Sequence, residues 1–104
     1  MTYTVYVPHY FYLARCSDDS LYAGTCIDLL AREEKHNEGR GAKYTRSRLP
    51  VRFIYHETFR TLSAARKREA AVKKLQKEEK EALVLRKKKP KKSAQRQSQR
   101  SRVR

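Results

Sequence analysis

The sequence predicts an α+β domain in which a small antiparallel sheet is flanked by helices, with the element order β-β-α-β-α-α. Two aromatic-rich extended runs, residues 10–16 and 21–25, lie on either side of a polar turn and indicate a β-hairpin. A third extended run and two stretches with apolar residues at helical spacing follow in the second half of the chain. The length of 104 residues suits one domain and leaves no room for a second.

The two extended runs are joined by the turn formers Ser17-Asp18-Asp19-Ser20. Paired residues of an antiparallel hairpin share a face and neighbours along a strand alternate, so the register decides whether the phenols of Tyr12 and Tyr22 meet. A three- or five-residue connection places both phenols on one side, whereas a two- or four-residue turn places them on opposite sides. Ordinary packing is the more frequent role of strand tyrosines, because aromatic residues favour strands.

A helix is expected over residues 28–38. Asp28 is a suitable N-cap residue, good helix formers follow it, and Gly39 and Gly41 end the helix. Residues 40–48 are basic and contain glycine, so we expect them to form a loop.

The second half of the chain predicts a strand over residues 51–59 and a helix over residues 62–75. Ala65 and Val72 lie on one face of that helix and give it an apolar stripe. Residues 77–85 contain further helix formers and predict a shorter last helix at the edge of the sheet.

Charge is the strongest signal in the composition, because 26 Lys and Arg against 11 Asp and Glu give a net charge of +15. Such a balance favours polyanionic partners through phosphate contacts and counterion release. Ten of the basic residues and none of the acidic ones lie in residues 86–104, which leaves +5 for residues 1–85. We expect residues 1–85 to form the folded domain and residues 86–104 to be a basic disordered tail, because the tail has almost no apolar residues to bury.

The two cysteines are expected to stay reduced, because Cys16 lies beside the expected turn and Cys26 lies far down the partner strand. No apolar run approaches the ~20 residues that span a bilayer, and the start of the chain does not resemble a cleavable signal. The sequence therefore predicts a cytoplasmic protein with no membrane partner.

Three charged or titratable residues are candidates for chemistry. Arg32 and His36 are spaced i, i+4 and stand on one face of the expected helix, where the simpler alternative is a solvated basic face that also holds Lys35. Glu69 lies within the apolar stripe of residues 62–75, where an unpaired carboxylate is costly to bury, so it requires a cation. A metal ion or Arg32 would serve, and so would a nearby lysine if Glu69 lies at the edge of the stripe.

Two tripeptides, Tyr10-Phe11-Tyr12 and Tyr22-Ala23-Gly24, precede the helix expected over residues 28–38. Within that helix, Arg32 and His36 lie ten and fourteen positions past Tyr22. This spacing resembles the GIY-YIG nuclease superfamily, in particular its small free-standing, UPF0213-like members. The resemblance covers about residues 9–85.

Two further features support the resemblance. Residues 36–46 read H-N-E-G-R-G-A-K-Y-T-R and are similar to the H-N-x-G-x-G-A-x-Y-T-R run of the small members, and Glu69 falls where the family has its metal-binding glutamate. The departures are Tyr10 and Phe11 in place of Gly and Ile, and Ala23 in place of the middle Ile of the second signature. We expect them to change packing in the sheet and to leave the two phenols in place.

The resemblance implies a three-stranded antiparallel sheet flanked by helices and a divalent-metal-dependent endonuclease that hydrolyses DNA, including structured DNA or repair intermediates. The catalytic residues carried over are Tyr12, Tyr22, Arg32, His36 and Glu69. Glu69 would bind Mg²⁺ or Mn²⁺, together with waters and a phosphate oxygen. A phenol, most of all that of Tyr12, would take or relay the proton of the attacking water, while Arg32 neutralises charge on the phosphate. A free phenol titrates near pH ~10, so Arg32, His36 or a metal-bound hydroxide must favour the phenolate.

The expected loop mixes cations with one aromatic side chain and would hold backbone phosphates beside the cut. Its residues with this role are Arg40, Lys43, Tyr44, Arg46 and Arg48. DNA is the expected partner, and RNA stays open. A single active site that nicks one strand suits a monomer, whereas cutting both strands requires a dimer or two visits.

Two other functions fit parts of the sequence. A non-catalytic nucleic-acid-binding module with the same fold would have the same charge pattern. A basic ribosome-associated or RNA-packaging protein would account for the net charge of +15 and the tail, but it explains Glu69 poorly.

Overall fold

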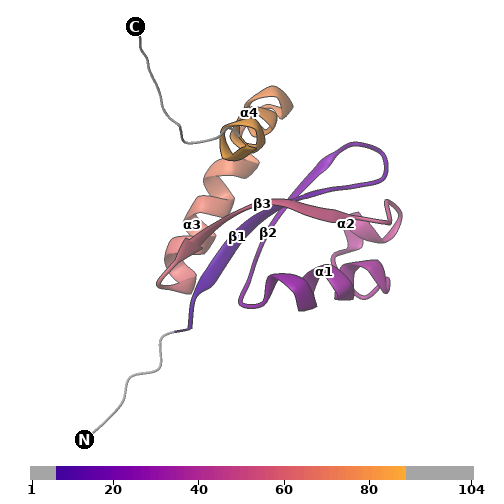
Figure 1. Ribbon diagram of the computed structural model, residues 1–104, viewed down its shortest axis with the longest axis horizontal. Coiled ribbons are helices and arrows are strands. Elements are labelled where there is room, and N and C mark those ends of the chain that lie inside the picture. The colour runs from indigo at the N-terminus through magenta and orange to yellow at the C-terminus, as the bar shows by residue number, and fades with distance from the viewer. Residues whose placement is uncertain (1–6, 89–104) are drawn as a thin grey trace, which may run out of the picture.

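A computed structural model describes residues 7–88 of the chain, which form one sheet with helices on both sides. The elements are β1 (His9–Arg15), β2 (Leu21–Cys26), α1 (Leu29–Asn37), α2 (Lys43–Arg46), β3 (Arg52–Phe59), α3 (Leu62–Lys73) and α4 (Lys77–Lys88). The sheet has the strand order β2-β1-β3. Both pairings are antiparallel, which confirms the predicted three-stranded antiparallel sheet. Helices α1 and α2 lie on one side of the sheet, and α3 and α4 lie on the other (Figure 1).

The connection between β1 and β2 settles the relation between the two phenols. It is five residues long, residues 16–20, and the register pairs Tyr12 with Gly24 and Tyr22 with Ala14. Tyr12 and Tyr22 therefore emerge on the same face of the sheet, with ring centroids 6.4 Å apart.

Each face of the sheet has a hydrophobic core of its own, because successive side chains of a strand point to opposite faces. The core under α3 and α4 contains Phe11, Leu13, Ala23, Val72, Leu83 and Val84. The core on the opposite face contains Tyr12, Ala14, Cys16, Cys26 and Val51. Both cysteines are buried and free, which confirms the prediction that they do not pair.

Helix α1 is fixed at both ends by side-chain hydrogen bonds. The Asp28 carboxylate accepts from the backbone N–H of Ala31 at 3.0 Å and caps the first turn, as the sequence predicts. At the other end the Asn37 amide donates to the Val51 carbonyl at 3.0 Å and accepts from the Val51 N–H at 2.8 Å. These two bonds tie the end of α1 to the chain entering β3.

The expectation of a loop over residues 40–48 was wrong at residues 43–46, which form the short helix α2. Thr45 is buried, and its hydroxyl donates to the Ala42 carbonyl at 2.9 Å within this turn. A four-residue turn is too short to show hydrophobic periodicity. It is stabilised by contacts with α1 that exist only in the folded chain.

The last two helices follow the predicted positions closely. Thr61 caps α3 by accepting from the Ala64 N–H at 3.1 Å. Helix α4 continues through residues 86–88, which we expected to belong to the tail, because strong helix formers continue to that point. The rest of the predicted tail, residues 89–104, lies outside the described residues. Within residues 7–88 no helix has the length and apolar character needed to cross a membrane.

Candidate active site

A cavity of about 240 Å³ opens on the face of the sheet that carries α1 and α2. It brings together four of the five residues predicted to be catalytic, namely Tyr12, Tyr22, Arg32 and His36. The rest of its wall comes from Lys35, Arg40, Gly41 and Ala42. The hairpin supplies the phenols, and the i, i+4 spacing on α1 supplies the guanidinium and the imidazole from one helix face.

Three side chains form a hydrogen-bonded chain at the base of the cavity. The Tyr12 hydroxyl lies 2.9 Å from His36 Nε2, and His36 Nδ1 lies 2.8 Å from the Thr45 hydroxyl. Thr45 uses its single proton to donate to the Ala42 carbonyl, so it accepts from His36 Nδ1–H. A neutral His36 with its proton on Nδ1 then offers Nε2 as the acceptor for the Tyr12 hydroxyl. The network thus assigns one tautomer to His36.

The surroundings keep His36 neutral and Tyr12 protonated. Burial lowers the pKa of His36, and the positive charges of Arg32 and Lys35 lower it further. Burial also raises the pKa of Tyr12 well above the ordinary phenol value, with a second contribution from Tyr22, and the charge of Arg32 only partly opposes this shift. The resting site therefore holds a phenol that donates to a neutral imidazole, and the expected phenolate is disfavoured.

Arg32 is half-buried in the wall of the cavity. Its Nη1 donates to the Thr25 carbonyl on β2 at 3.2 Å, which ties the guanidinium to the edge strand. The remaining N–H donors of a guanidinium form a planar fork that suits a phosphate group entering the cavity.

Aromatic packing fixes the orientation of the two phenols. Phe53 of β3 stacks on Tyr12, with centroids 4.0 Å apart and an interplanar angle of 14°. Tyr44 of α2 stacks on Tyr22, with centroids 5.9 Å apart and an angle of 22°. Phe53 was not predicted to be a site residue, because its position in the sequence is that of an ordinary strand aromatic.

Two glycines leave the space that the site requires. A Cβ on Gly24 would lie 2.5 Å from Tyr12 Oη and 2.7 Å from Cζ. A Cβ on Gly41 would lie 2.7 Å from Cγ of His36 and closer still to Nδ1. From the sequence, Gly41 was expected only to end the helix, and Thr45 was not expected to belong to the site. The similarity of residues 36–46 to the family run was the available signal for both.

Tyr44 and Arg48 are more constrained than the predicted phosphate-binding role requires. The Arg48 guanidinium carbon lies 3.9 Å from the Tyr44 ring centroid, while Tyr22 stacks on the same ring. Arg48 also donates to the Asp18 carboxylate at 3.0 Å and to the Tyr44 carbonyl at 2.8 Å. A base stacking on Tyr44 would have to displace Arg48, so in this arrangement Tyr44 supports Tyr22.

The other basic residues with a predicted phosphate role are exposed. Arg40 borders the cavity and forms an ion pair with Glu38. Lys43 and Arg46 project from α2 into solvent. Of these three cations only Arg40 lines the cavity.

Glu69, the fifth predicted catalytic residue, is not among the residues that line the cavity. Its side chain is 19% exposed, and its carboxylate pairs with the Lys73 ammonium at 2.7 Å, which is the nearby-lysine alternative that the sequence left open. Lys73 in turn lines a hollow next to β2 together with Tyr22. Among residues 7–88 no cluster of three or more His, Cys, Asp and Glu side chains is arranged to hold a metal ion.

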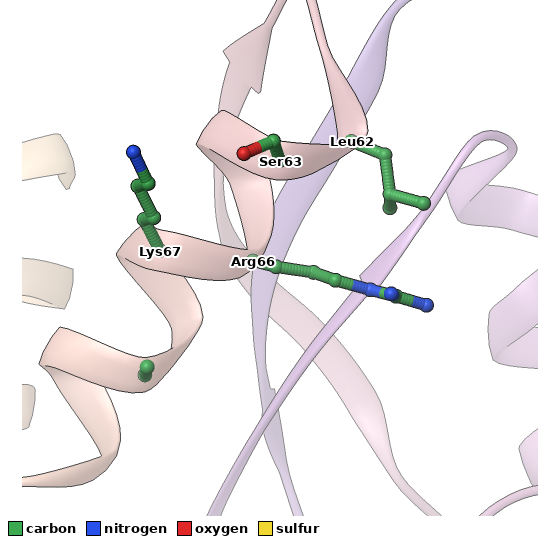
Figure 2. A pocket seen from close by; sticks show the side chains of 5 residues that line it. Leu62, Ser63, Arg66 and Lys67 are labelled. Carbon is green, nitrogen blue, oxygen red and sulfur yellow. The ribbon is translucent and has the colours of Figure 1, made fainter.

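A larger hollow of about 460 Å³ lies along the outer face of α3 (Figure 2). Its labelled side chains are Leu62, Ser63, Arg66 and Lys67, and those of Arg66 and Lys67 point away from each other. Because all of its lining residues come from one helix and no polar groups converge, this hollow is a surface feature and lacks the character of a ligand site.

The fold and the cavity define a small α+β domain with a buried tyrosine–histidine pair beside an arginine. Residues 8–93 match the GIY-YIG catalytic domain, and the chain belongs to this family, whose domains are those of a nuclease superfamily. A UPF0213 protein of Listeria monocytogenes serovar 1/2a is 48% identical over 77 residues, which cover 74% of this chain and 86% of that protein. A UPF0213 protein of Staphylococcus aureus strain Mu50 is 47% identical over 76 residues, which cover 73% of this chain and 93% of the relative.

Two solved structures are similar to this one. The solution NMR structure of a UPF0213 protein from Bacillus halodurans has a TM-score of 0.52 and 41% sequence identity, and it covers 80% of this chain and 88% of its own. A solution NMR structure of a protein from E. faecalis has a TM-score of 0.53 and 44% identity, with coverages of 76% and 84%. These similarities agree with the predicted fold and with a small single-domain member of the family.

Proposed function

We propose that the protein is a divalent-metal-dependent endonuclease that hydrolyses phosphodiester bonds of DNA. The observation that carries this proposal is the Tyr12 hydroxyl, which lies 2.9 Å from Nε2 of a neutral His36 in a cavity that also contains Arg32. The arrangement supplies a proton acceptor and a cation for a phosphate group within one pocket.

In this proposal Tyr12 relays a proton from the attacking water to His36. Tyr12 accepts the proton from water as its own hydroxyl proton passes to His36 Nε2, so no free phenolate is needed. The oxygen of that water forms a bond to phosphorus, and the bond from phosphorus to the 3′-oxygen breaks. Arg32 and Lys35 lower the pKa of His36, which helps the imidazolium to release the proton to solvent or to the leaving oxygen.

Glu69 is the residue that would hold Mg²⁺ or Mn²⁺. A single carboxylate fits Mg²⁺, because this ion keeps several waters and takes few protein ligands. The bound ion would stabilise negative charge on the leaving oxygen. The ammonium of Lys73 lies 2.7 Å from the Glu69 carboxylate and would have to move away for such a ligand set to form.

The direct test is an assay with branched, nicked, single-stranded and double-stranded DNA in Mg²⁺ and in Mn²⁺. We expect metal-dependent cutting of at least one substrate, which Glu69→Gln and Tyr12→Phe each abolish. Glu78→Gln is the matched control, since Glu78 is exposed on α4. Binding of the same DNA without any cutting would overturn the proposal.

A non-catalytic nucleic-acid-binding module is the second candidate, and the ion pair of Glu69 with Lys73 is the observation that favours it. Deleting residues 89–104 separates the endonuclease from a third candidate, a basic RNA-packaging protein, because the endonuclease would keep its metal-dependent turnover. A basic RNA-packaging protein would instead lose nearly all of its polyanion binding. Two free cysteines support a reducing compartment, and we propose the cytoplasm.

A further inference from the structure

We propose that one strand of the nucleic-acid substrate leaves the catalytic cavity along the outer edge of β2, in a groove whose lysine wall contains Lys73, Lys77 and Lys80. The ligand class is the phosphate backbone of a single strand. This inference rests on the proposed function for the identity of the polymer, but its test does not depend on cutting.

The groove is formed by two adjoining hollows beside β2. The first has a volume of about 320 Å³ and is lined by Leu21, Tyr22, Ala23, Tyr44, Lys73 and Lys80. The second has a volume of about 170 Å³ and is lined by Ser20, Leu21, Lys77 and Lys80. They share Leu21 and Lys80, and the first shares Tyr22 with the catalytic cavity. A strand bound at the catalytic cavity therefore has a path past Tyr22 into both hollows.

The floor of the groove is an edge strand. Within residues 7–88, β2 pairs with β1 on one side and with no strand on the other. The outer edge of an edge strand presents backbone N–H and C=O groups, and N–H groups are donors for phosphate oxygens.

The lysine wall has cationic charge available for a phosphate. Among the described residues, the Lys80 ammonium makes no hydrogen bond or ion pair. Lys80 precedes the buried residues Leu83 and Val84 by three and four positions, so its stem lies on the core-facing side of α4. Lys77 pairs with Glu81, and that same carboxylate also binds Arg15, which in turn lies 3.6 Å from the Asp19 carboxylate. The charge of Lys77 is therefore partly neutralised, and Lys80 is the cation of the wall that is available to a phosphate.

Two aromatic side chains also line the first hollow. Tyr22 and Tyr44 stack on each other, and Tyr44 is 39% exposed although Arg48 lies over its ring. Aromatic side chains facing a row of cations form the combination with which proteins hold single strands without reading their sequence. Aromatic side chains suit a single strand, whose bases are exposed, better than a duplex, whose bases are already paired and stacked, and we therefore assign one strand.

The test measures binding of a fluorescein-labelled 12-mer of thymidylate to the full-length chain by anisotropy, without divalent cations, from 50 to 300 mM salt. Loss of one phosphate contact on a single strand lowers the slope of log K against log salt by about 0.7, which corresponds to about fourfold weaker binding at 0.15 M. We expect this change for Lys80→Ala. Lys80→Arg should retain the slope, because it keeps the charge.

Lys67→Ala is the matched control, since Lys67 is exposed on the outer face of α3 and its loss changes the net charge equally. Equal effects of Lys80→Ala and Lys67→Ala, or an effect of Lys80→Ala on a duplex alone, would overturn the proposal. A slope lowered by Lys80→Ala in a protein that cuts no DNA would retain the groove and reject the endonuclease. If the protein cuts DNA and Lys80→Ala leaves the slope unchanged, the endonuclease would be retained and the groove rejected.

Discussion

Replacing Thr45 with valine tests the hydrogen-bonded chain at the base of the site. Valine has nearly the same shape as threonine but cannot accept from His36 Nδ1–H, which in the native protein lies 2.8 Å from the Thr45 hydroxyl. Because His36 is only 2% exposed, that N–H would be left without a partner, at a cost of about 1–3 kcal/mol. The tautomer with its proton on Nε2 avoids this cost, because Nε2–H can donate to Tyr12.

The size of the effect follows from that cost. A preference of about 1–3 kcal/mol for the wrong tautomer lowers the population of the productive one by roughly 5- to 150-fold. We expect kcat of Thr45→Val to fall by a factor in this range, with little change in KM for the DNA. Thr45→Ser keeps the hydroxyl and should retain most of the activity.

The assay is steady-state cleavage of the best substrate from the panel, together with thermal unfolding of each variant. Equal kcat for the wild type and Thr45→Val would refute the assignment of His36 as proton acceptor through Nε2. If Thr45→Ser loses as much activity as Thr45→Val, the assignment would also be refuted, because the loss would then be caused by altered packing and not by the missing hydrogen bond.

Three further predictions concern pH, packing and stability. The kcat/KM profile should fall on the acid side through the pKa of His36, below its ordinary value of about 6.5, and Lys35→Gln should move this limb to higher pH because it removes one of the charges that lower that pKa. Gly24→Ala should destabilise the protein by about 1–3 kcal/mol in chemical denaturation and reduce activity, since the new methyl group overlaps the phenol of Tyr12; unchanged stability and activity would contradict the observed packing. The hydrogen bond from Arg15 lowers the pKa of Glu81 to about 2, so its contribution to stability is present above about pH 4.5 and is lost as the pH falls toward 2. Glu81→Gln should therefore lower the free energy of unfolding at pH 7 by on the order of 1 kcal/mol, and the difference from wild type should shrink between pH 5 and pH 2.

Much of the fold could be predicted because its signals are local. The turn formers between the two aromatic runs place the hairpin, Asp28 begins α1, and the apolar positions of α3 follow helical spacing. Helix α2 could not be predicted in this way, because its four residues depend on the contact between Thr45 and His36 across nine positions of the chain.

The candidate site was predictable where spacing determines geometry. Arg32 and His36 share a helix face, and the even separation of Tyr12 and Tyr22 left two registers, of which the structure has the one that joins them. The role of Phe53 depends on the pairing of β1 with β3, which no local pattern encodes. The raised pKa of Tyr12 could not be predicted either, because burial of this phenol outweighs the charge of Arg32, and the extent of burial is a property of the tertiary structure.

The most direct test of the account is the tautomer of His36, measured by long-range ¹H–¹⁵N NMR on the full-length chain at pH 7. We expect a neutral ring with the proton on Nδ1 and with Nε2 unprotonated, a pattern that Thr45→Val should reverse. A protonated Nε2 in the wild type, whether as the other tautomer or as imidazolium, would contradict the claim that His36 accepts the proton of Tyr12.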